Sequence, residues 1–535
     1  MNKVLKGLVA VVSTAAMAIA GFAGAASATA ADNYSITITP AKAGHVYEAY
    51  QVFTGNLDAG TGVLGNVTWG TGIDQDKLSD EGVSSLIKGK TAAEVSEALA
   101  QKSDNSADAK AYAKAFGGVL STTHTDSGAF DTTNSAYTIS GLAAGYYLIQ
   151  DKAGSVTGDD SYTSFILKVT QENTTVTPKS TTPTVDKKVQ DEVADKDKNS
   201  DDDNGWGDTA DHDINESFKF KLNATIPASA DLADYTKYEV KFTDTMSKGV
   251  TYESLDSVKV KGKDASDTDK AWNVAEGQYN ASDVAADPTT GNQSWTLTIN
   301  DVIAACKGIN IAQGFSVEVV YKAHLNEKAT VTTANGPTDN ANAVYLEYSN
   351  NPNAEGLGKT SEKKVYVYTF GITNKKVVDN EAGEPLKDAG FKLYTDTNCE
   401  HEYALVWDAS LNAYRPVGAN ETGVEMNSNS EGQFPIKGLD AGIYYLKETA
   451  TPAGYTTAAV QTVKINATHE VTVGGAPNVT LSSDSTMNNV IVDKSGSSLP
   501  STGGMGTTVL YAAGAAIVLV AAFGIAFAVR RRNAR

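Results

Sequence analysis

The segment Phe218-Lys219-Phe220-Lys221-Leu222 alternates apolar and charged side chains along its whole length. Because successive side chains of a β-strand point to opposite faces, this pattern predicts a strand with one buried and one solvated face. Other segments alternate in the same way, at 35–39, 238–242, 295–299 and 315–319. Turn signals separate these runs, and Thr, Val, Tyr and Gly are plentiful around them. The chain is therefore expected to be mainly β, with the architecture of β-sandwiches.

One region departs from this pattern. Thr91-Ala92-Ala93-Glu94 is typical of a helix capping box, and Val95 and Leu99 follow at i, i+4 spacing. The Ala-rich segment 106–116 is also helical in character. We expect one or two short helices inserted into the first β domain.

Polar connectors divide the chain. A Thr- and Pro-rich linker runs from Thr174 to Thr184, and further connectors lie at 350–364 and 495–498. The length also fits three domains. We expect three tandem immunoglobulin-like β-sandwiches, a first domain at 31–178, a middle domain at 179–362 and a third domain at 363–494.

The N-terminus has the features of a secretory signal peptide. Lys3 and Lys6 precede an apolar stretch from Leu8 to Phe22, and Ala28-Thr29-Ala30 fits a cleavage site. Residues 1–30 are therefore expected to be removed during export.

The C-terminal segment 495–535 contains Leu499-Pro500-Ser501-Thr502-Gly503, an apolar run from Val509 to Val529, and a tail rich in arginine. At about 1.5 Å per helical residue the run is ~31 Å long, enough to cross a bilayer core. The basic tail would stay on the cytoplasmic side. The order of these three parts resembles the sorting signal of Gram-positive surface proteins, whose LPxTG motif is cut between Thr and Gly by sortase. The resemblance implies cleavage of the Thr502–Gly503 bond and attachment to peptidoglycan.

Composition excludes several classes of protein. The net charge of −20 argues against a nucleic-acid partner. Two cysteines in 535 residues, Cys306 and Cys399, exclude a disulfide-rich scaffold and leave their own pairing open. The sequence has no catalytic motif of a hydrolase or nucleotide-binding enzyme, and the acidic loop at 195–206 lacks the glycine and glutamate of a calcium loop. We expect no cofactor and no metal.

Two segments of the third domain, Leu386 to Tyr394 and Tyr444 to Tyr455, resemble the collagen-adhesin B-type repeat of Gram-positive surface proteins. In that family a glutamate promotes a spontaneous amide (isopeptide) bond between a lysine of the first strand and an Asn or Asp of the last. The resemblance implies Glu448 as the catalytic acid.

The chemistry of such a bond requires a dry core. A lysine at its solution pKa of about 10.4 is protonated and cannot attack a carbonyl. Burial lowers that pKa and raises the pKa of a carboxyl group, which can then donate a hydrogen bond to the carbonyl that is attacked. Fixed proximity supplies much of the remaining rate enhancement.

Alternation selects the reacting residues of the third domain. Phe370 and Ile372 share a strand face with Lys376, which is our choice, with Lys375 as the alternative. In the last strand, at 488–494, alternation puts Asn489 and Asp493 on one face. The resemblance implies Asp493 as the partner, because that family places its bond-forming residue just before the linker, with Asn489 as the alternative.

The middle domain resembles the isopeptide-forming middle domain of major pilins, in the segments 183–189, 238–249 and 346–352. The resemblance implies Lys187 as the amine, Asp244 as the catalytic acid and Asn350 as the acceptor. In the first domain, Gln150 and Asp151 stand where the glutamate is expected, which argues against a bond there.

The linker segment Val176-Thr177-Pro178-Lys179 resembles the V-Y-P-K segment of major pilins, with Thr177 in place of Tyr. In those proteins the lysine attacks the threonyl–sortase intermediate of the next subunit. The resemblance implies that Lys179 is the polymerising lysine.

Together these features indicate the shaft subunit of a cell-wall-anchored pilus that mediates adhesion, and not an enzyme, because isopeptide formation is a single self-modification. The expected partners are pilin-specific and housekeeping sortases, identical subunits, peptidoglycan and a host or cell-surface ligand. The alternative is a monomeric wall-anchored adhesin.

Overall fold

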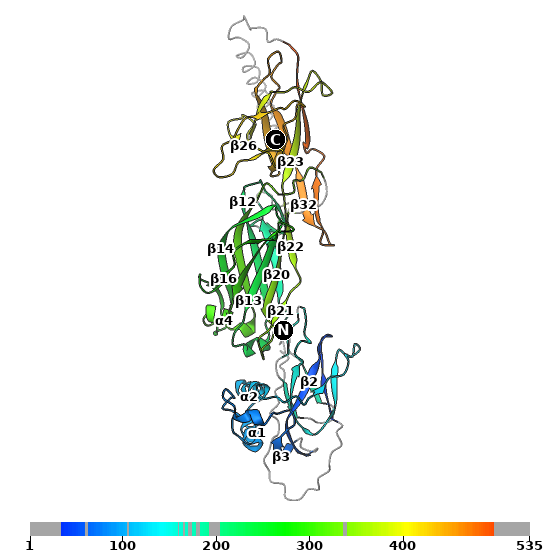
Figure 1. The fold of residues 1–535 in the computed structure, drawn as a ribbon, viewed down its shortest axis with the longest axis vertical. Helices are drawn as coiled ribbons and strands as arrows, with labels where there is room; N and C mark the ends of the chain where they lie inside the picture. The colour runs from blue at the N-terminus through cyan, green and yellow to red at the C-terminus, as the bar shows by residue number, and fades with distance from the viewer. Residues whose placement is uncertain are drawn as a thin grey trace, which may run out of the picture. The chain divides into compact units, whose positions relative to one another are not determined.

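The computed structural model describes residues 34–58, 63–103, 106–158, 160–163, 166–169, 174–177, 182–191, 204–334 and 340–496. The described chain is mainly β, as predicted (Figure 1). It divides into two compact units. The first unit holds the described residues up to Gly371, together with Lys437–Ala441 and Ile465–Ser485. The second unit holds Ile372–Ile436, Gly442–Lys464 and the described residues from Thr486 onward. The three domain boundaries expected from the sequence stay predictions.

The N-terminal sheets of the first unit are built from β1–β8. One has the order β5-β1-β8, and the other has the order β3-β2-β6-β7, with β4 beside β2. The apolar sides of β1, β2 and β6 are buried in a common core with β5. The bounds are β1 Tyr34–Ile38, β2 Tyr47–Asp58, β3 Val63–Trp69, β4 Thr125–Asp126, β5 Tyr137–Leu142, β6 Gly145–Asp151, β7 Ile166–Val169 and β8 Thr174–Val176.

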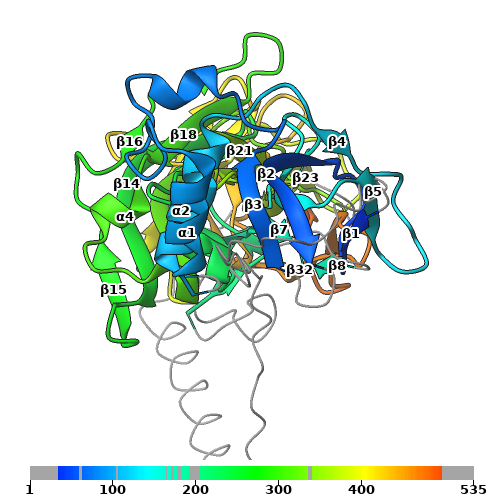
Figure 2. The same ribbon diagram turned by 90° about the horizontal axis from the view of Figure 1, so that it is seen from below.

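The predicted helices are confirmed as α1 (Ala92–Ala100) and α2 (Ala107–Gly117), after a 3-10 turn η1 (Asp76–Ser79). The capping box at the start of α1 forms, since the backbone N–H of Thr91 donates to Glu94 Oε2 over 2.8 Å. Both helices lie beside β2 and β3 (Figure 2) and share a buried apolar cluster with them.

The middle sheets of the first unit run in the orders β10-β9-β12-β19-β14-β15 and β11-β22-β20-β13-β18-β16, with β17 and β21 beside the second path. The predicted strand at 218–222 lies inside β12, where buried residues alternate with more exposed ones. The bounds are β9 Thr184–Gln190, β10 Trp206–Gly207, β11 Thr209–Asp211, β12 Ser217–Ile226, β13 Val240–Met246, β14 Val250–Lys263, β15 Asp269–Asn273, β16 Asn280–Ala281, β17 Ala285–Ala286, β18 Gln293–Ile299, β19 Phe315–Leu325, β20 Ala341–Ser349, β21 Leu357–Lys359 and β22 Lys363–Tyr368.

Short helical turns and a hairpin complete the first unit. They are η3 (Ala230–Asp234), α4 (Val302–Ala305), η4 (Ile311–Gln313) and the paired strands β32 (Ala467–Val471) and β33 (Pro477–Leu481). Within the described ranges, no helix is long and apolar enough to cross a bilayer. The predicted span from Val509 to Val529 lies outside those ranges.

Two sheets build the second unit, in the orders β26-β27-β29-β23-β34 and β25-β24-β30-β31, with β28 beside β24. The first strand, β23, pairs in parallel with the last strand, β34. The bounds are β23 Phe370–Val378, β24 Gly390–Tyr394, β25 Glu402–Tyr403, β26 Leu405–Asp408, β27 Ala413–Pro416, β28 Met426–Asn427, β29 Ile436–Leu439, β30 Gly442–Ala450, β31 Gln461–Ile465 and β34 Asn488–Asp493. Cys306 and Cys399 are both free.

Candidate functional site

Two lysines of the described chain are buried, Lys187 in the first unit and Lys376 in the second. A charged ammonium group is costly to bury without a partner, so lysine is rarely found in a core. Both are the lysines that the sequence analysis selected as amines. Each defines a candidate site.

In the second unit, Lys376 lies between Glu448 and Asp493. Its Nζ is 3.1 Å from Glu448 Oε2 and also donates to Asp493 Oδ1. All three side chains have 0% exposure to solvent. The structure thus brings together the three residues that the sequence placed at this site.

Strand pairing explains this convergence. Lys376 stands opposite Ile491 in the parallel register of β23 and β34, and Val378 stands opposite Asp493. Glu448 comes from the facing sheet, where it pairs with Phe391 across β24 and β30. The Phe391 ring also covers the ammonium group, with Nζ 5.4 Å from the ring centroid.

The electrostatics of this site are unbalanced, because one ammonium group faces two carboxyl groups. Burial raises the pKa of Asp493, and the neighbouring Lys376 only partly offsets this effect. Glu448 Oε2 also accepts a hydrogen bond from the backbone N–H of Ala458 over 2.7 Å. Among the described residues, Glu448 Oε1 and Asp493 Oδ2 have no hydrogen-bond partner. One proton shared between these two oxygens would give each of them a hydrogen-bond partner. A carboxyl group that holds the proton can react with an amine.

The alternative residues lie outside this cluster. Lys375 is partly exposed. The side-chain amide of Asn489 donates to Asn374 Oδ1 over 3.1 Å. The geometry therefore favours Lys376 with Asp493.

In the first unit, Lys187 lies in a cluster with Asp244, Tyr321 and Asn342. Its Nζ donates to Asp244 Oδ2 and lies 3.1 Å from the Tyr321 hydroxyl. That hydroxyl donates to Asp244 Oδ1 over 3.0 Å and accepts from Asn342 Nδ2 over 2.5 Å. All four side chains are buried.

The cluster lies between the two middle sheets. Lys187 on β9 and Tyr321 on β19 come from one sheet, while Asp244 on β13 and Asn342 on β20 come from the other. Two aromatic rings lie against the amine, since Nζ is 5.0 Å from the centroid of the Phe220 ring and 5.4 Å from that of the Tyr321 ring.

Burial moves both partners of the Lys187–Asp244 pair toward their neutral forms. Loss of hydration lowers the pKa of the Lys187 ammonium group to about 8, although Asp244 opposes the shift. Burial likewise raises the pKa of Asp244, and Lys187 opposes that shift. A neutral amine beside a neutral carboxylic acid is the state that amide formation requires.

The predicted acceptor of the first unit, Asn350, lies away from Lys187. Its Nδ2 donates to the carbonyl of Asp160 over 3.4 Å. Asn342 lies near the start of β20, and Asn350 directly follows the end of that strand. At about 3.3 Å per residue, the two positions are ~26 Å apart along the strand. Asn342 was not selected from the sequence, although it is a polar residue that shares a face with Val344 and Leu346.

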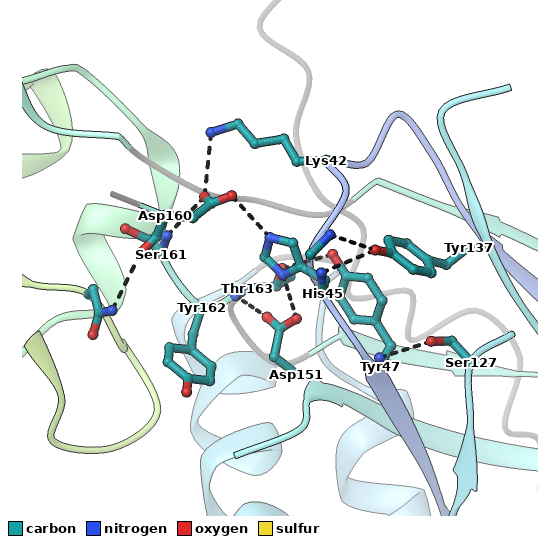
Figure 3. Close-up of polar contacts among 12 residues, drawn as sticks. Lys42, His45, Tyr47, Ser127, Tyr137, Asp151, Asp160, Ser161, Tyr162 and Thr163 are labelled. Atoms are coloured by element: carbon teal, nitrogen blue, oxygen red, sulfur yellow. Dashed lines mark hydrogen bonds and ion pairs between the residues drawn. The ribbon is translucent and has the colours of Figure 1, made fainter. Parts of the chain in front are cut away.

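In the N-terminal part of the first unit, a buried histidine, His45, contacts two carboxyl groups (Figure 3). His45 Nδ1 is 2.6 Å from Asp151 Oδ1, and His45 Nε2 is 3.3 Å from Asp160 Oδ2. Burial alone would lower the pKa of His45, but the hydrogen bonds to Asp151 and Asp160 outweigh it and raise the pKa to about 9. Gln150 points elsewhere, with Nε2 3.4 Å from Glu48 Oε2. In this part of the described chain, no lysine is buried beside a carboxyl group.

Several predicted residues lie outside the described ranges: the signal peptide, Lys179 and Leu499, Pro500, Ser501, Thr502 and Gly503. In the sequence, Lys179 comes three residues after the last residue of β8, Val176. Thr177, the residue directly after β8, donates from its hydroxyl to the Thr39 carbonyl over 3.2 Å.

The fold and the two clusters define a β-sheet protein whose buried lysines face carboxyl groups. Residues 371–477 match the SpaA family model, described as a prealbumin-like fold domain. Residues 491–534 match the model of the LPXTG cell wall anchor motif. The chain is therefore a cell-wall-anchored surface protein that carries a SpaA-type domain next to its anchor. This confirms the expected sorting signal, which implies sortase processing and attachment to peptidoglycan.

The chain is also similar to solved major pilins. SpaD from Corynebacterium diphtheriae shares 17% identity, with 86% of this chain and 98% of that chain covered and a TM-score of 0.44. The T6 backbone pilin of Streptococcus pyogenes shares 16% identity, with coverage of 87% and 98% and a TM-score of 0.49. BcpA of Bacillus cereus shares 15% identity, with coverage of 87% and 99% and a TM-score of 0.39. The comparison with curated proteins gives no significant match.

Proposed function

We propose that the chain is the shaft subunit of a covalently polymerised pilus, in which sortase joins Thr502 of one subunit to Lys179 of the next. The observation that carries the proposal is the presence of two fully buried lysines, each against a carboxyl group, in a chain with a cell-wall anchor. Such sites suit a protein that is held together by internal amide bonds. The finished fibre would mediate adhesion to host surfaces or other cells.

In the second unit, Lys376 Nζ would attack Cγ of Asp493 while Glu448 acts as the acid. The N–C bond forms, the C–O bond breaks, and water leaves with a proton from the amine. In the first unit, Lys187 would attack Asn342 with Asp244 as the acid, and ammonia would leave. Neither reaction needs a co-reactant, since the amine supplies the proton that departs.

The consequence of the bonds is mechanical. The bond in the second unit would close a loop of 117 residues between the first and last strands of its sheet. By analogy with disulfide loop entropy, a loop of this size stabilises by about 4–5 kcal/mol. A covalent tie between these strands also prevents the unit from unravelling when the fibre is pulled. This suits a surface protein whose two cysteines are free.

Polymerisation is tested by Lys179→Ala in cells that express the matching pilin sortase. The expected result is loss of the high-mass ladders that survive boiling in detergent, while wall-anchored monomer remains. Lys188→Ala, which changes a partly buried lysine in the same region, is the control and should keep the ladders. Unchanged ladders in Lys179→Ala would contradict the proposed linkage, and ladders absent from the wild type would favour the monomeric adhesin.

A further inference from the structure

We propose that Tyr321 is a catalytic residue of the bond-forming site in the first unit, and that its hydroxyl carries a proton from Asp244 to the nitrogen that leaves Asn342. The inference rests on the proposed Lys187–Asn342 bond. One hydroxyl group contacts the nucleophile, the acid and the leaving group, at 3.1 Å, 3.0 Å and 2.5 Å.

Packing holds the Tyr321 ring in place independently of these hydrogen bonds. Its centroid is 5.3 Å from that of Phe220 and 5.1 Å from that of Trp295. The residue is fully buried in β19, opposite Phe220 in the antiparallel register with β12. Aromatic contacts of this kind stabilise a core without any contribution from the hydroxyl group. The hydroxyl can therefore be removed with little loss of packing.

The first role of the hydroxyl is to orient the amide of Asn342. Because Nδ2 donates to Tyr321, Oδ1 lies on the other side of the amide carbon. Oδ1 is buried and has no hydrogen-bond partner among the described residues. An acceptor left in this state is costly, and a protonated Asp244 that turned toward it would satisfy it and polarise the carbonyl.

The second role is proton transfer. The contacts form a continuous path from Lys187 Nζ to Asp244 Oδ2, across the carboxyl group to Oδ1, then through the Tyr321 hydroxyl to Asn342 Nδ2. As Nζ bonds to Cγ, it gives a proton to Oδ2. Before attack, the Tyr321 hydroxyl donates to Oδ1 and accepts from Nδ2, so both hydrogen bonds reverse once Cγ is tetrahedral and Nδ2 has a free lone pair. A protonated Asp244 then gives the proton on Oδ1 to the Tyr321 oxygen, and Tyr321 gives its own proton to Nδ2. The Cγ–Nδ2 bond then breaks and ammonia leaves. Asp244 is again a neutral acid, with its proton now on Oδ2, and Tyr321 is again a neutral hydroxyl group.

The second unit has a different arrangement that fits its acceptor. In its described part, the side-chain groups hydrogen-bonded to Lys376 Nζ are both carboxyl groups. Water leaves Asp493 and ammonia would leave Asn342, and each leaving group must gain one proton. The amide nitrogen is the poorer leaving group of the two, so its proton must arrive before the C–N bond breaks, which accounts for a relay at Asn342.

The test follows the cross-link over time. The mature chain is made by cell-free synthesis, synthesis is stopped, and the fraction of Lys187–Asn342 peptide pair is measured by mass spectrometry after digestion. Tyr321→Phe should slow cross-linking at least 10-fold. Tyr252→Phe, whose ring lies 5.6 Å from that of Tyr321, is the matched control and should react at the wild-type rate. Equal rates for Tyr321→Phe and wild type would overturn the relay but leave the bond intact, whereas no cross-link in the wild type would overturn both.

A packing defect must be separated from loss of the relay. Asn342→Asp replaces the amide by a carboxyl acceptor like that of the second unit, so removal of the hydroxyl should slow this variant much less. Equal slowing in both backgrounds would indicate a structural role and overturn the proposal. The unfolding temperatures of Asn342→Ala and of Asn342→Ala with Tyr321→Phe, neither of which can form the bond, should agree within a few degrees.

Discussion

Lys376 and Asp493 are separated by 117 residues in the chain, yet their side chains are in direct contact and neither is exposed to solvent. The contact joins the first strand of the second unit to its last strand. A salt bridge at this depth contributes little net stability, because both charges lose their hydration. Conversion to an amide removes both charges and makes the same contact permanent.

The first prediction concerns the acid of this site. Glu448→Gln keeps the shape of the side chain but cannot transfer a proton, so the bond should not form. The Lys376–Asp493 peptide pair, and the ~18 Da mass deficit that condensation produces, should both disappear. The unfolding temperature of the second unit should fall by roughly 10 °C or more, as expected from the loss of about 4–5 kcal/mol.

The control for this variant is Glu425→Gln, because Glu425 bonds to Thr449 and is not part of the cluster. It should retain the cross-linked peptide. If Glu448→Gln contains as much Lys376–Asp493 cross-linked peptide as the wild type, Glu448 is not the acid.

The second prediction separates the two asparagines of the first unit. Asn342→Ala should abolish the ~17 Da deficit from ammonia loss, while Asn350→Ala should keep it. The reason is that Asn342 reaches the Lys187 cluster through Tyr321, whereas Asn350 contacts the Asp160 carbonyl. Intact-mass spectrometry of the two purified variants decides between them, and the opposite pattern would restore Asn350 as the acceptor.

These two sites differ in how far the sequence could identify them. Alternation in the first strand indicates Lys376, and the family resemblance chooses Asp493 over Asn489 on the last strand. A parallel pairing brings those two strands together. At the first site, Asn342 lies in β20 and Asn350 directly follows that strand. The choice between them depends on the register of β20 with β13, where Met246 stands opposite Asn342. Strand patterns do not specify that register.

The role of Tyr321 could not be predicted from the sequence either. It lies in an alternating strand, Phe315 to Leu325, where a buried aromatic residue is the ordinary expectation. Its hydroxyl is informative only because three polar groups from other strands converge on it. By contrast, the helical insertion was predictable, since capping and i, i+4 spacing are local properties of the sequence.

The third prediction concerns the pH dependence of the N-terminal sheets. The pKa of His45 is raised from 6.5 to about 9 because Asp151 and Asp160 stabilise its charged form. The folded state thus binds this proton more tightly than the unfolded state does. The stability from this group is fully present below pH ~6.5 and is lost as the pH rises through ~9. The loss should be on the order of 3 kcal/mol.

Calorimetry of the mature chain at pH 6 and at pH 9.5 measures this effect as a lower midpoint temperature of one unfolding transition at the higher pH. His45→Gln, which cannot become charged, should unfold earlier at pH 6 and lose this pH dependence. His401→Gln is the control, because that side chain is 77% exposed, and it should behave as the wild type does. Equal pH dependence in His45→Gln and wild type would mean that the buried His45–Asp151 pair does not control the stability of these sheets.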